Sequence, residues 1–260
     1  MAPYLPADSD GTQRSEEDGD QPNITVLVTG FGPFQAQYPV NPSFEVTKAL
    51  PTVLPKTLSG DAAINIVSYP SPLRVAYADT QKLLPELLAA HADSIDLVLH
   101  IGMASGRTYY AAEKYAHTRG YTRHKDIDGH FGASPADDND NDSGPSLPDR
   151  LTTSLAFDAL IARWRDAVRD IPTGEPGHAA DVRPSEDAGS FLCDYTYCTS
   201  MKWFARRNHC VDGGGPRARP VLFFHVPAAS DTATLETGGA VAQSLIRAMA
   251  RELVEKRDKE

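Results

Sequence analysis

A cysteine in the segment 187–194 (DAGSFLCD) stands where a thiol can become reactive. Cys193 follows a break at Gly189, and residues 190–207 have the spacing of a helix. The first turn of a helix offers backbone N–H groups without intrahelical partners and the positive end of the helix dipole, so it favours a thiolate and can stabilise an oxyanion. The alternative is an inert buried side chain, as most free cysteines are.

His225 is the matching candidate for a base. It lies near the end of an apolar run, residues 221–226 (VLFFHV), which predicts a buried strand. An imidazole there could take a proton from a thiol on a neighbouring helix and later protonate a leaving amine. The alternative is a histidine whose partners all lie in the core. A Cys–His pair usually has a carboxylate that orients the imidazole, and spacing alone does not choose one among 35 acidic residues.

A zinc site is a competing interpretation of the same region, because Cys193, Cys198, His209 and Cys210 lie close together in the sequence. Cys193 and Cys198 are separated on the predicted helix by about 140°, given about 100° per residue. The region also has no CxxC pair. The spacing therefore argues against zinc.

A glycine-rich turn, residues 30–34 (GFGPF), follows the first predicted strand. Such a turn can bind phosphate, but no dinucleotide or P-loop fingerprint is present, and Pro33 removes a backbone donor. Phe31 and Phe34 either form apolar walls at the strand end or belong to the core.

The elements that must position these residues alternate along the chain. Short apolar runs predict strands at residues 24–29, 64–69, 96–101 and 221–226. Amphipathic spacing predicts helices at residues 42–50, 73–91, 151–168, 190–207 and 234–255. This alternation predicts a mostly parallel sheet with helices on both faces, whose ligands gather at the carboxyl ends of the strands.

Composition sets the class of protein. A chain of 260 residues that is 41% hydrophobic can bury one large core, and a net charge of -10 argues against a nucleic-acid or membrane partner. Three cysteines do not make a disulfide scaffold, and the N-terminus lacks a secretory signal, so a cytoplasmic protein is expected. We expect residues 1–22 to be a disordered acidic tail, residues 23–260 to form one domain, and residues 126–149 to form a polar surface loop.

Four segments, taken in order, resemble the pyroglutamyl peptidase I (pyrrolidone-carboxylate peptidase) family of cysteine peptidases. They are GFGPF with NPS at residues 30–34 and 41–43, AEKYAHTRGY at 112–121, AGSFLCD at 188–194 and HVP at 225–227. The second segment is closer to the animal-like members. Residues 102–107 (GMASGR) depart from the GQAGGR of many bacterial members, and residues 35–37 (QAQ) replace a second glycine pair.

The resemblance implies a three-layer α/β/α sandwich of phosphorylase/hydrolase-like type and a Cys193–His225–Glu113 triad. It implies hydrolysis of the amide bond after an N-terminal pyroglutamyl residue, through an acyl-thioester and without a metal or organic cofactor. The expected substrates are small peptides, and the expected state is a monomer or weak oligomer. The residues implied to surround the pyroglutamyl ring are Phe31, Phe34, Phe191 and Leu192. An apolar slot suits the ring methylenes of a lactam, while its amide needs polar partners.

Two other functions stay open from the sequence. One is a catalytically inactive member of the same fold that binds blocked N-termini. The other is a nucleoside-phosphorylase-like enzyme on a similar sheet, although no cluster of phosphate-binding arginines stands at the predicted strand ends.

Overall fold

The structure is a computed structural model, and it describes residues 24–57, 62–135, 147–210, 215 and 217–257. The predicted acidic tail, residues 1–22, lies outside the described residues, as does the centre of the predicted loop at 126–149. The described ends of that loop contain neither helix nor strand, but they are anchored to the domain by the buried side chains of Asp126 and Leu147.

A mixed sheet of seven strands forms the centre of the molecule, in the order β2-β3-β1-β4-β9-β5-β8. The neighbours β3, β1, β4 and β9 run parallel, β5 is antiparallel to β9, and β8 is parallel to β5. The bounds are β1 Ile24–Gly30, β2 Val53–Leu54, β3 Ile64–Ser68, β4 Leu97–Met103, β5 Tyr110–Glu113, β8 Val182–Ser185 and β9 Val221–Val226. A separate ribbon pairs β6, Tyr115–His117, with β7, Arg150–Thr152.

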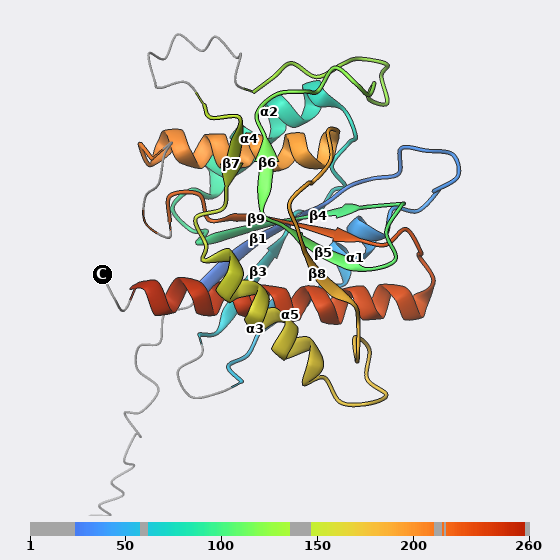
Figure 1. Ribbon diagram of the computed structural model, residues 1–260, viewed down its shortest axis with the longest axis vertical. Coiled ribbons are helices and arrows are strands. Elements are labelled where there is room, and N and C mark those ends of the chain that lie inside the picture. Colours follow the sequence, from blue (N-terminus) through green and yellow to red (C-terminus); the bar gives the residue numbers. More distant parts are fainter. Residues whose placement is uncertain (1–23, 58–61, 136–146, 211–214, 216, 258–260) are drawn as a thin grey trace, which may run out of the picture.

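Helices cover both faces of this sheet, so the predicted three-layer α/β/α architecture is confirmed. Figure 1 shows α2 and α4 on one face and α1, α3 and α5 on the other. The bounds are α1 Pro42–Ala49, α2 Tyr77–His91, α3 Phe157–Arg169, α4 Leu192–Arg207 and α5 Thr232–Arg257. None of the described helices is long and apolar enough to cross a membrane.

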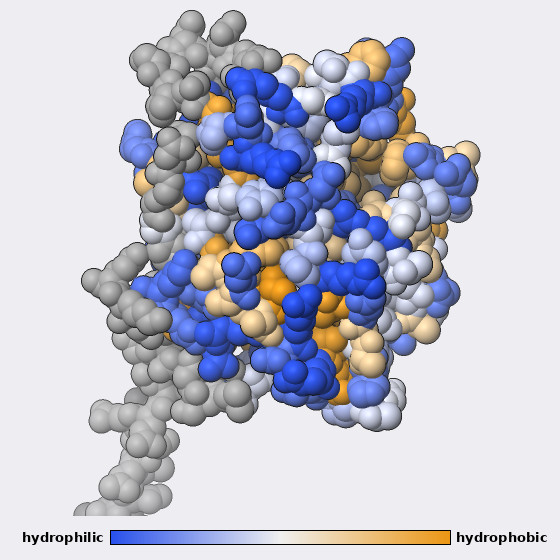
Figure 2. All heavy atoms as spheres, in the orientation of Figure 1, coloured by the Kyte–Doolittle hydropathy of each residue, from blue (hydrophilic) through white to orange (hydrophobic). Residues whose placement is uncertain are grey.

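Two hydrophobic cores flank the sheet, and this explains why its central strands are continuous apolar runs. In β9, Phe223 belongs to the core under α2 and α4, while Phe224 belongs to the opposite core with Trp164 of α3. Because successive side chains of a strand point to opposite faces, a strand covered on both faces must be apolar throughout. Hydrophilic side chains cover much of the outer face seen in Figure 2.

Two predicted helices begin at least four residues later than expected. Residues 151–168 were expected to form one helix, but Leu151 lies in β7 and α3 begins at Phe157. The helical spacing is misleading there because Leu151 packs into the core under α4, whereas Leu160 packs into the other core. Likewise α2 begins at Tyr77, because Leu73 bridges to Phe31 in an extended segment.

Candidate active site

The start of α4 positions the candidate nucleophile. Gly189 adopts a φ of 92°, a left-handed conformation that favours glycine, and its N–H donates to Asp187 Oδ1 over 2.9 Å. The chain then extends through Phe191, and the helix begins at Leu192. Cys193 is therefore the second residue of α4, where backbone N–H groups have no intrahelical acceptor.

Asp194, next to the candidate nucleophile, anchors this helix start to β6. Its buried carboxylate accepts hydrogen bonds from the backbone N–H of His117 at 3.1 Å and from the Tyr121 hydroxyl at 2.8 Å. His117 Nδ1 lies 3.2 Å from the same carboxylate. This contact raises the pKa of His117, and desolvation raises the pKa of Asp194. The first turn of α4 is thus held from the side by a polar network.

The register of β5 and β9 brings His225 and Glu113 together. Ala111 pairs with His225, and Glu113 pairs with Phe223 across the antiparallel ladder. Glu113 and His225 are therefore diagonal neighbours on one face, which is a reachable distance for long side chains. His225 Nδ1 lies 2.7 Å from Glu113 Oε1. An ionised carboxylate only accepts, so Nδ1–H is the donor, and Nε2 is left to take a proton.

Gly102 places the thiol beside this pair. Gly102 stands opposite His225 in the parallel pairing of β4 with β9. A Cβ atom on Gly102 would lie 2.9 Å from Cys193 Sγ and 2.7 Å from the Phe223 ring. Only a residue without a side chain lets α4 approach the sheet this closely. The three groups of the implied triad thus come from α4, β9 and β5.

The environment of the thiol differs from the sequence-based expectation. Burial is the main cause that raises the pKa of Cys193 to about 12, and the charges of Glu113 and Asp194 add to it, while Arg107 lowers it. The helix start was expected to favour the thiolate. Desolvation outweighs that effect, so the resting group is a thiol that needs a base.

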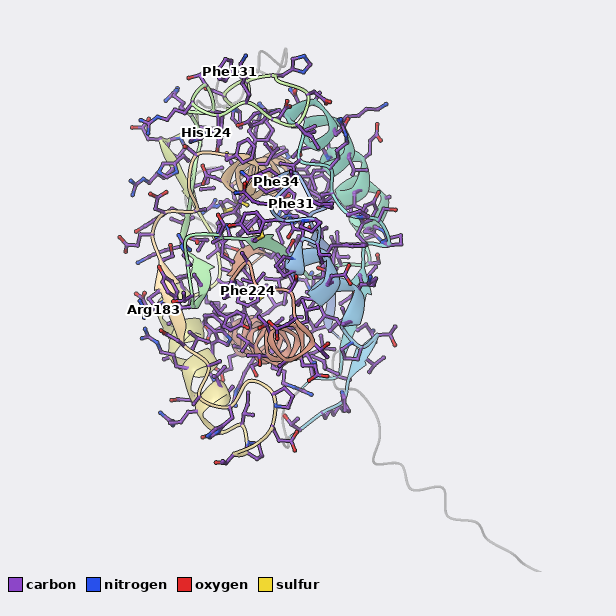
Figure 3. All side chains as sticks on the ribbon, turned by 90° about the vertical axis from the view of Figure 1, so that its right-hand side faces the viewer. Phe31, Phe34, His124, Phe131, Arg183 and Phe224 are labelled. Atoms are coloured by element: carbon purple, nitrogen blue, oxygen red, sulfur yellow. The ribbon has the colours of Figure 1, made fainter. Side chains whose placement is uncertain are left out.

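A cavity of about 330 Å³ opens in front of the thiol. Six of the predicted site residues line it, namely Phe31, Phe34, Phe191, Leu192, Cys193 and His225. Glu113 lies behind His225 and is fully buried. Phe31 and Phe34 both line this cavity, and Figure 3 shows them near one another in the central part of the view. Phe31 is both a core residue and a wall of the cavity, so both interpretations of the sequence hold for it.

The aromatic wall of the cavity is built by residues from distant segments. The rings of Phe34 and Phe191 lie 5.8 Å apart, and Phe191 meets Tyr77 edge-on at 6.0 Å. Asn41 also lines the cavity, but its side chain serves the fold: its Oδ1 accepts from Ser43, and its Nδ2 donates to Gly32. The hydrogen bond from Asn41 Nδ2 to the carbonyl oxygen of Gly32 joins the GFGPF turn to the start of α1.

Arg107 lies at the site, although no role was predicted for it from the sequence. It lines the cavity, and its Nη1 donates to Glu113 Oε1 over 2.6 Å. Its position in the GMASGR segment, after a strand end, was the available indication. Gly102 was noted only as part of the same segment.

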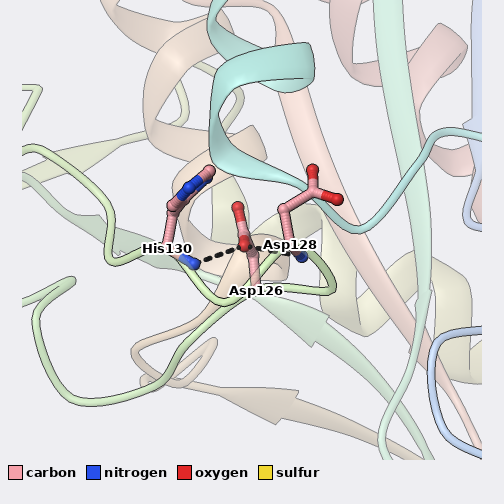
Figure 4. Close-up of side chains that lie close together, drawn as sticks. All are labelled: Asp126, Asp128 and His130. Atoms are coloured by element: carbon pink, nitrogen blue, oxygen red, sulfur yellow. Dashed lines mark hydrogen bonds between the residues drawn. The ribbon is translucent and has the colours of Figure 1, made fainter.

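A cluster of Asp126, Asp128 and His130 is the one group of described residues with the composition and spacing of a metal site. Figure 4 shows that Asp126 Oδ1 instead accepts the backbone N–H groups of Asp128 and His130. Its Oδ2 accepts from the N–H of Tyr77 at 2.9 Å. Because Ala76 gives α2 no side-chain cap, Asp126 caps that helix from a distant loop.

Comparisons with known proteins show which family this chain resembles. The family model described as pyroglutamyl peptidase matches residues 24–250. Pyroglutamyl-peptidase 1 of Mus musculus is 30% identical over 88% of this chain and 91% of its own length. The pyrrolidone-carboxylate peptidase of Bacillus subtilis (strain 168) is 28% identical over 78% of this chain and 77% of its own.

The fold is also that of solved structures. A pyroglutamyl peptidase I from Bacillus amyloliquefaciens superposes with a TM-score of 0.63 at 21% identity, over 88% of this chain and 98% of that one. A pyrrolidone carboxyl peptidase variant from Pyrococcus furiosus gives 0.62 at 19% identity, over 88% and 100%. The family-model match covers most of the chain, and the predicted resemblance is confirmed: this chain belongs to the pyroglutamyl peptidase family.

Proposed function

We propose that this protein is a cysteine omega-peptidase that hydrolyses the amide bond after an N-terminal pyroglutamyl residue. Membership of the pyroglutamyl peptidase family supports the reaction. The observation that carries the assignment of residues is the contact of His225 with the buried Glu113, beside Cys193 at one cavity. We assign Cys193 as nucleophile, His225 as base and then acid, and Glu113 as the group that orients the imidazole.

Acylation begins with a neutral thiol. His225 Nε2 takes the thiol proton as Cys193 Sγ bonds to the pyroglutamyl carbonyl carbon. The negative charge that develops on the carbonyl oxygen lies near the first-turn N–H groups of α4, which suit an oxyanion. The imidazolium then protonates the departing amine nitrogen, the C–N bond breaks, and a thioester remains.

Deacylation uses the same groups in turn. His225 Nε2 takes a proton from water while the water oxygen bonds to the thioester carbonyl carbon. The C–S bond then breaks, pyroglutamate leaves, and the proton on His225 returns to Cys193 Sγ. Through both halves the Glu113 carboxylate accepts from Nδ1–H, which fixes the tautomer and stabilises the imidazolium.

The cavity walls support the choice of substrate. Phe31, Phe34 and Phe191 offer an apolar surface to the methylenes of a five-membered lactam. The pyroglutamyl group has no charged amine, so it avoids the cost of burying a charge there. The lactam N–H and C=O still require hydrogen-bond partners, which limits the fit to ligands that present an amide at one edge.

Several wider features belong to the same proposal. We expect small peptides as substrates, a cytoplasmic monomer or weak oligomer, and no nucleic-acid or membrane partner. The net charge of -10 and the odd number of cysteines support these expectations. We also retain the proposed domain division, with an acidic tail at residues 1–22, a single domain at 23–260 and a polar loop at 126–149.

The assignment is tested with a fluorogenic pyroglutamyl amide. We expect Cys193→Ser to lower kcat by about a thousandfold or more, because the alcohol is a much poorer nucleophile with this base. Cys210→Ser is the matched control, since Cys210 is a free cysteine away from the cavity. Full activity in Cys193→Ser would refute the assignment. Tight binding of pyroglutamyl peptides by the wild-type protein without turnover would instead favour the inactive binding module.

A further inference from the structure

Arg107 connects the buried carboxylate of the proposed triad to the segment that leads to the nucleophile. Its Nη1 donates to Glu113 Oε1 over 2.6 Å. Its Nη2 donates to the carbonyl oxygen of Asp187 over 2.9 Å and lies 3.3 Å from Ser185 Oγ. One guanidinium thus contacts β5, the end of β8 and the turn before α4. Such a fork fixes geometry as well as charge, because its donors are coplanar.

Glu113 depends on a positive partner because it is completely buried. An ionised carboxylate removed from water is costly unless it is paired and hydrogen-bonded. When His225 acts as a base it is neutral and supplies no positive charge, so the guanidinium of Arg107 is the cation beside Glu113 at that step. The contact from Arg107 holds Oε1 of Glu113, the oxygen that also accepts from His225 Nδ1.

The charge balance of the reactive state also indicates that Glu113 needs Arg107 as a positive partner. A thiolate on Cys193, an imidazolium on His225 and a carboxylate on Glu113 leave one net negative charge in a buried site. The guanidinium of Arg107 makes the group neutral. In agreement, the charge of Glu113 raises the pKa of Cys193, and the charge of Arg107 lowers it.

The other charged groups near the thiol do not replace Arg107. The titratable and charged groups that face Cys193 are His225 and Glu113 from the sheet, Asp194 from α4, Asp187 at the cavity and Arg107. Both aspartates are acidic, and the Asp194 carboxylate accepts from His117 and Tyr121. Arg107 is therefore the permanent cation of this group.

We propose that Arg107 is a positioning residue that pairs with Glu113 and aims its carboxylate at His225, and so promotes the thiolate–imidazolium form of Cys193 and His225. The proposal deepens the peptidase assignment, and its catalytic part rests on that assignment. Arg107 acts through Glu113 and does not take part in bond making or bond breaking.

The test follows the reactivity of Cys193 without any substrate. The rate at which iodoacetamide alkylates Cys193 is measured against pH by peptide mass spectrometry, in the wild type, Arg107→Gln and Arg107→Lys. We expect Arg107→Gln to lower the alkylation rate at about pH 8 by about tenfold or more, as loss of a nearby opposite charge does. Arg107→Lys should restore part of the rate. Arg183→Gln is the control, because Arg183 pairs with Asp181 at the outer edge of the molecule (Figure 3).

Steady-state kinetics on a pyroglutamyl amide separate positioning from substrate binding. We expect Arg107→Gln to lower kcat by about tenfold or more with KM changed less than about threefold, since the lost contact is not with substrate. Added guanidinium should raise the kcat of Arg107→Ala. An unchanged alkylation profile with unchanged kcat would overturn the proposal. A rise in KM alone would overturn it too, by making Arg107 a substrate contact.

Two controls keep the outcomes distinct. If Arg107→Gln does not fold, by circular dichroism and thermal melting, Arg107→Lys carries the test: an alkylation rate and a kcat equal to those of the wild type would contradict a need for the planar guanidinium fork. If the wild type does not hydrolyse pyroglutamyl amides, the proposed function fails. The alkylation profile still tests the link between Arg107 and Cys193.

Discussion

Glu113 Oε1 lies 2.7 Å from Nδ1 of His225, and the two residues are diagonal neighbours on one face of the β5–β9 ladder. This contact fixes which imidazole nitrogen carries the proton in the resting site. It also places the implied third member of the triad in the central sheet, at the last residue of β5.

The charge of Glu113 should matter more than its shape. We expect Glu113→Gln to lower kcat by about a hundredfold to ten-thousandfold, because an amide cannot stabilise the imidazolium and permits the wrong tautomer. Glu186→Gln is the control, since Glu186 is exposed. Steady-state kinetics check this, and a kcat within twofold of the wild type in Glu113→Gln would remove Glu113 from the triad.

Gly102 should tolerate no side chain. A Cβ atom there would lie under 3.0 Å from both Cys193 Sγ and the Phe223 ring. We expect Gly102→Ala to destabilise the fold by about 1–3 kcal/mol, as overpacking does, and to displace the thiol. Urea unfolding and activity assays measure both effects. Gly106→Ala, where a Cβ would meet nothing within 4 Å, should change neither. Equal behaviour of the two variants would contradict the close approach of α4 to the sheet.

Phe34 should act on substrate binding. Removing its ring opens the apolar wall beside Phe191, so we expect Phe34→Ala to raise KM by about five- to thirtyfold, the equivalent of about 1–2 kcal/mol of lost contact. Phe131→Ala is the control, because Phe131 is 50% exposed and lies outside the cavity. The opposite pattern, with KM altered only in Phe131→Ala, would place the substrate elsewhere.

The His117–Asp194 contact should make stability depend on pH. The contact raises the pKa of His117 above its ordinary value of 6.5. The stabilisation is therefore fully present below that value and is lost as pH rises through the higher value of the folded state. We expect His117→Gln to lose more stability at acidic than at alkaline pH in urea unfolding. His91→Gln, remote from Asp194, serves as control. A loss from His117→Gln that grows with pH would reverse the sign and contradict the ion pair.

The sequence predicted the central strands and most helices because their apolar spacing reflects burial directly. Residues 221–226 are a strand with the same bounds as predicted. The prediction of a helix from Leu151 onward was wrong because the apolar periodicity does not say which of the two cores a residue enters. The short strands β5 and β8 were not predicted, since four residues carry too little pattern and their pairing is non-local.

The residues of the candidate site also differ in whether the sequence could predict them. Cys193 and His225 stand at element ends, which the sequence can locate, whereas Glu113 was implied only by resemblance. Arg107 could not be assigned because its contacts join segments about eighty positions apart, as its bond to the carbonyl of Asp187 shows. The thiolate expectation failed for a related reason: a helix start is visible in the sequence, but the desolvation that opposes it depends on tertiary packing.

The most direct test of the proposed mechanism is to trap the acyl-enzyme. The protein is quenched with acid during turnover of a pyroglutamyl amide, digested, and analysed by peptide mass spectrometry. The expected result is a thioester adduct with the mass of one pyroglutamyl group on the peptide that contains Cys193, and none on Cys198 or Cys210. Turnover with the adduct on another residue, or with Cys193 unmodified in a variant whose deacylation is slowed, would contradict Cys193 as the nucleophile.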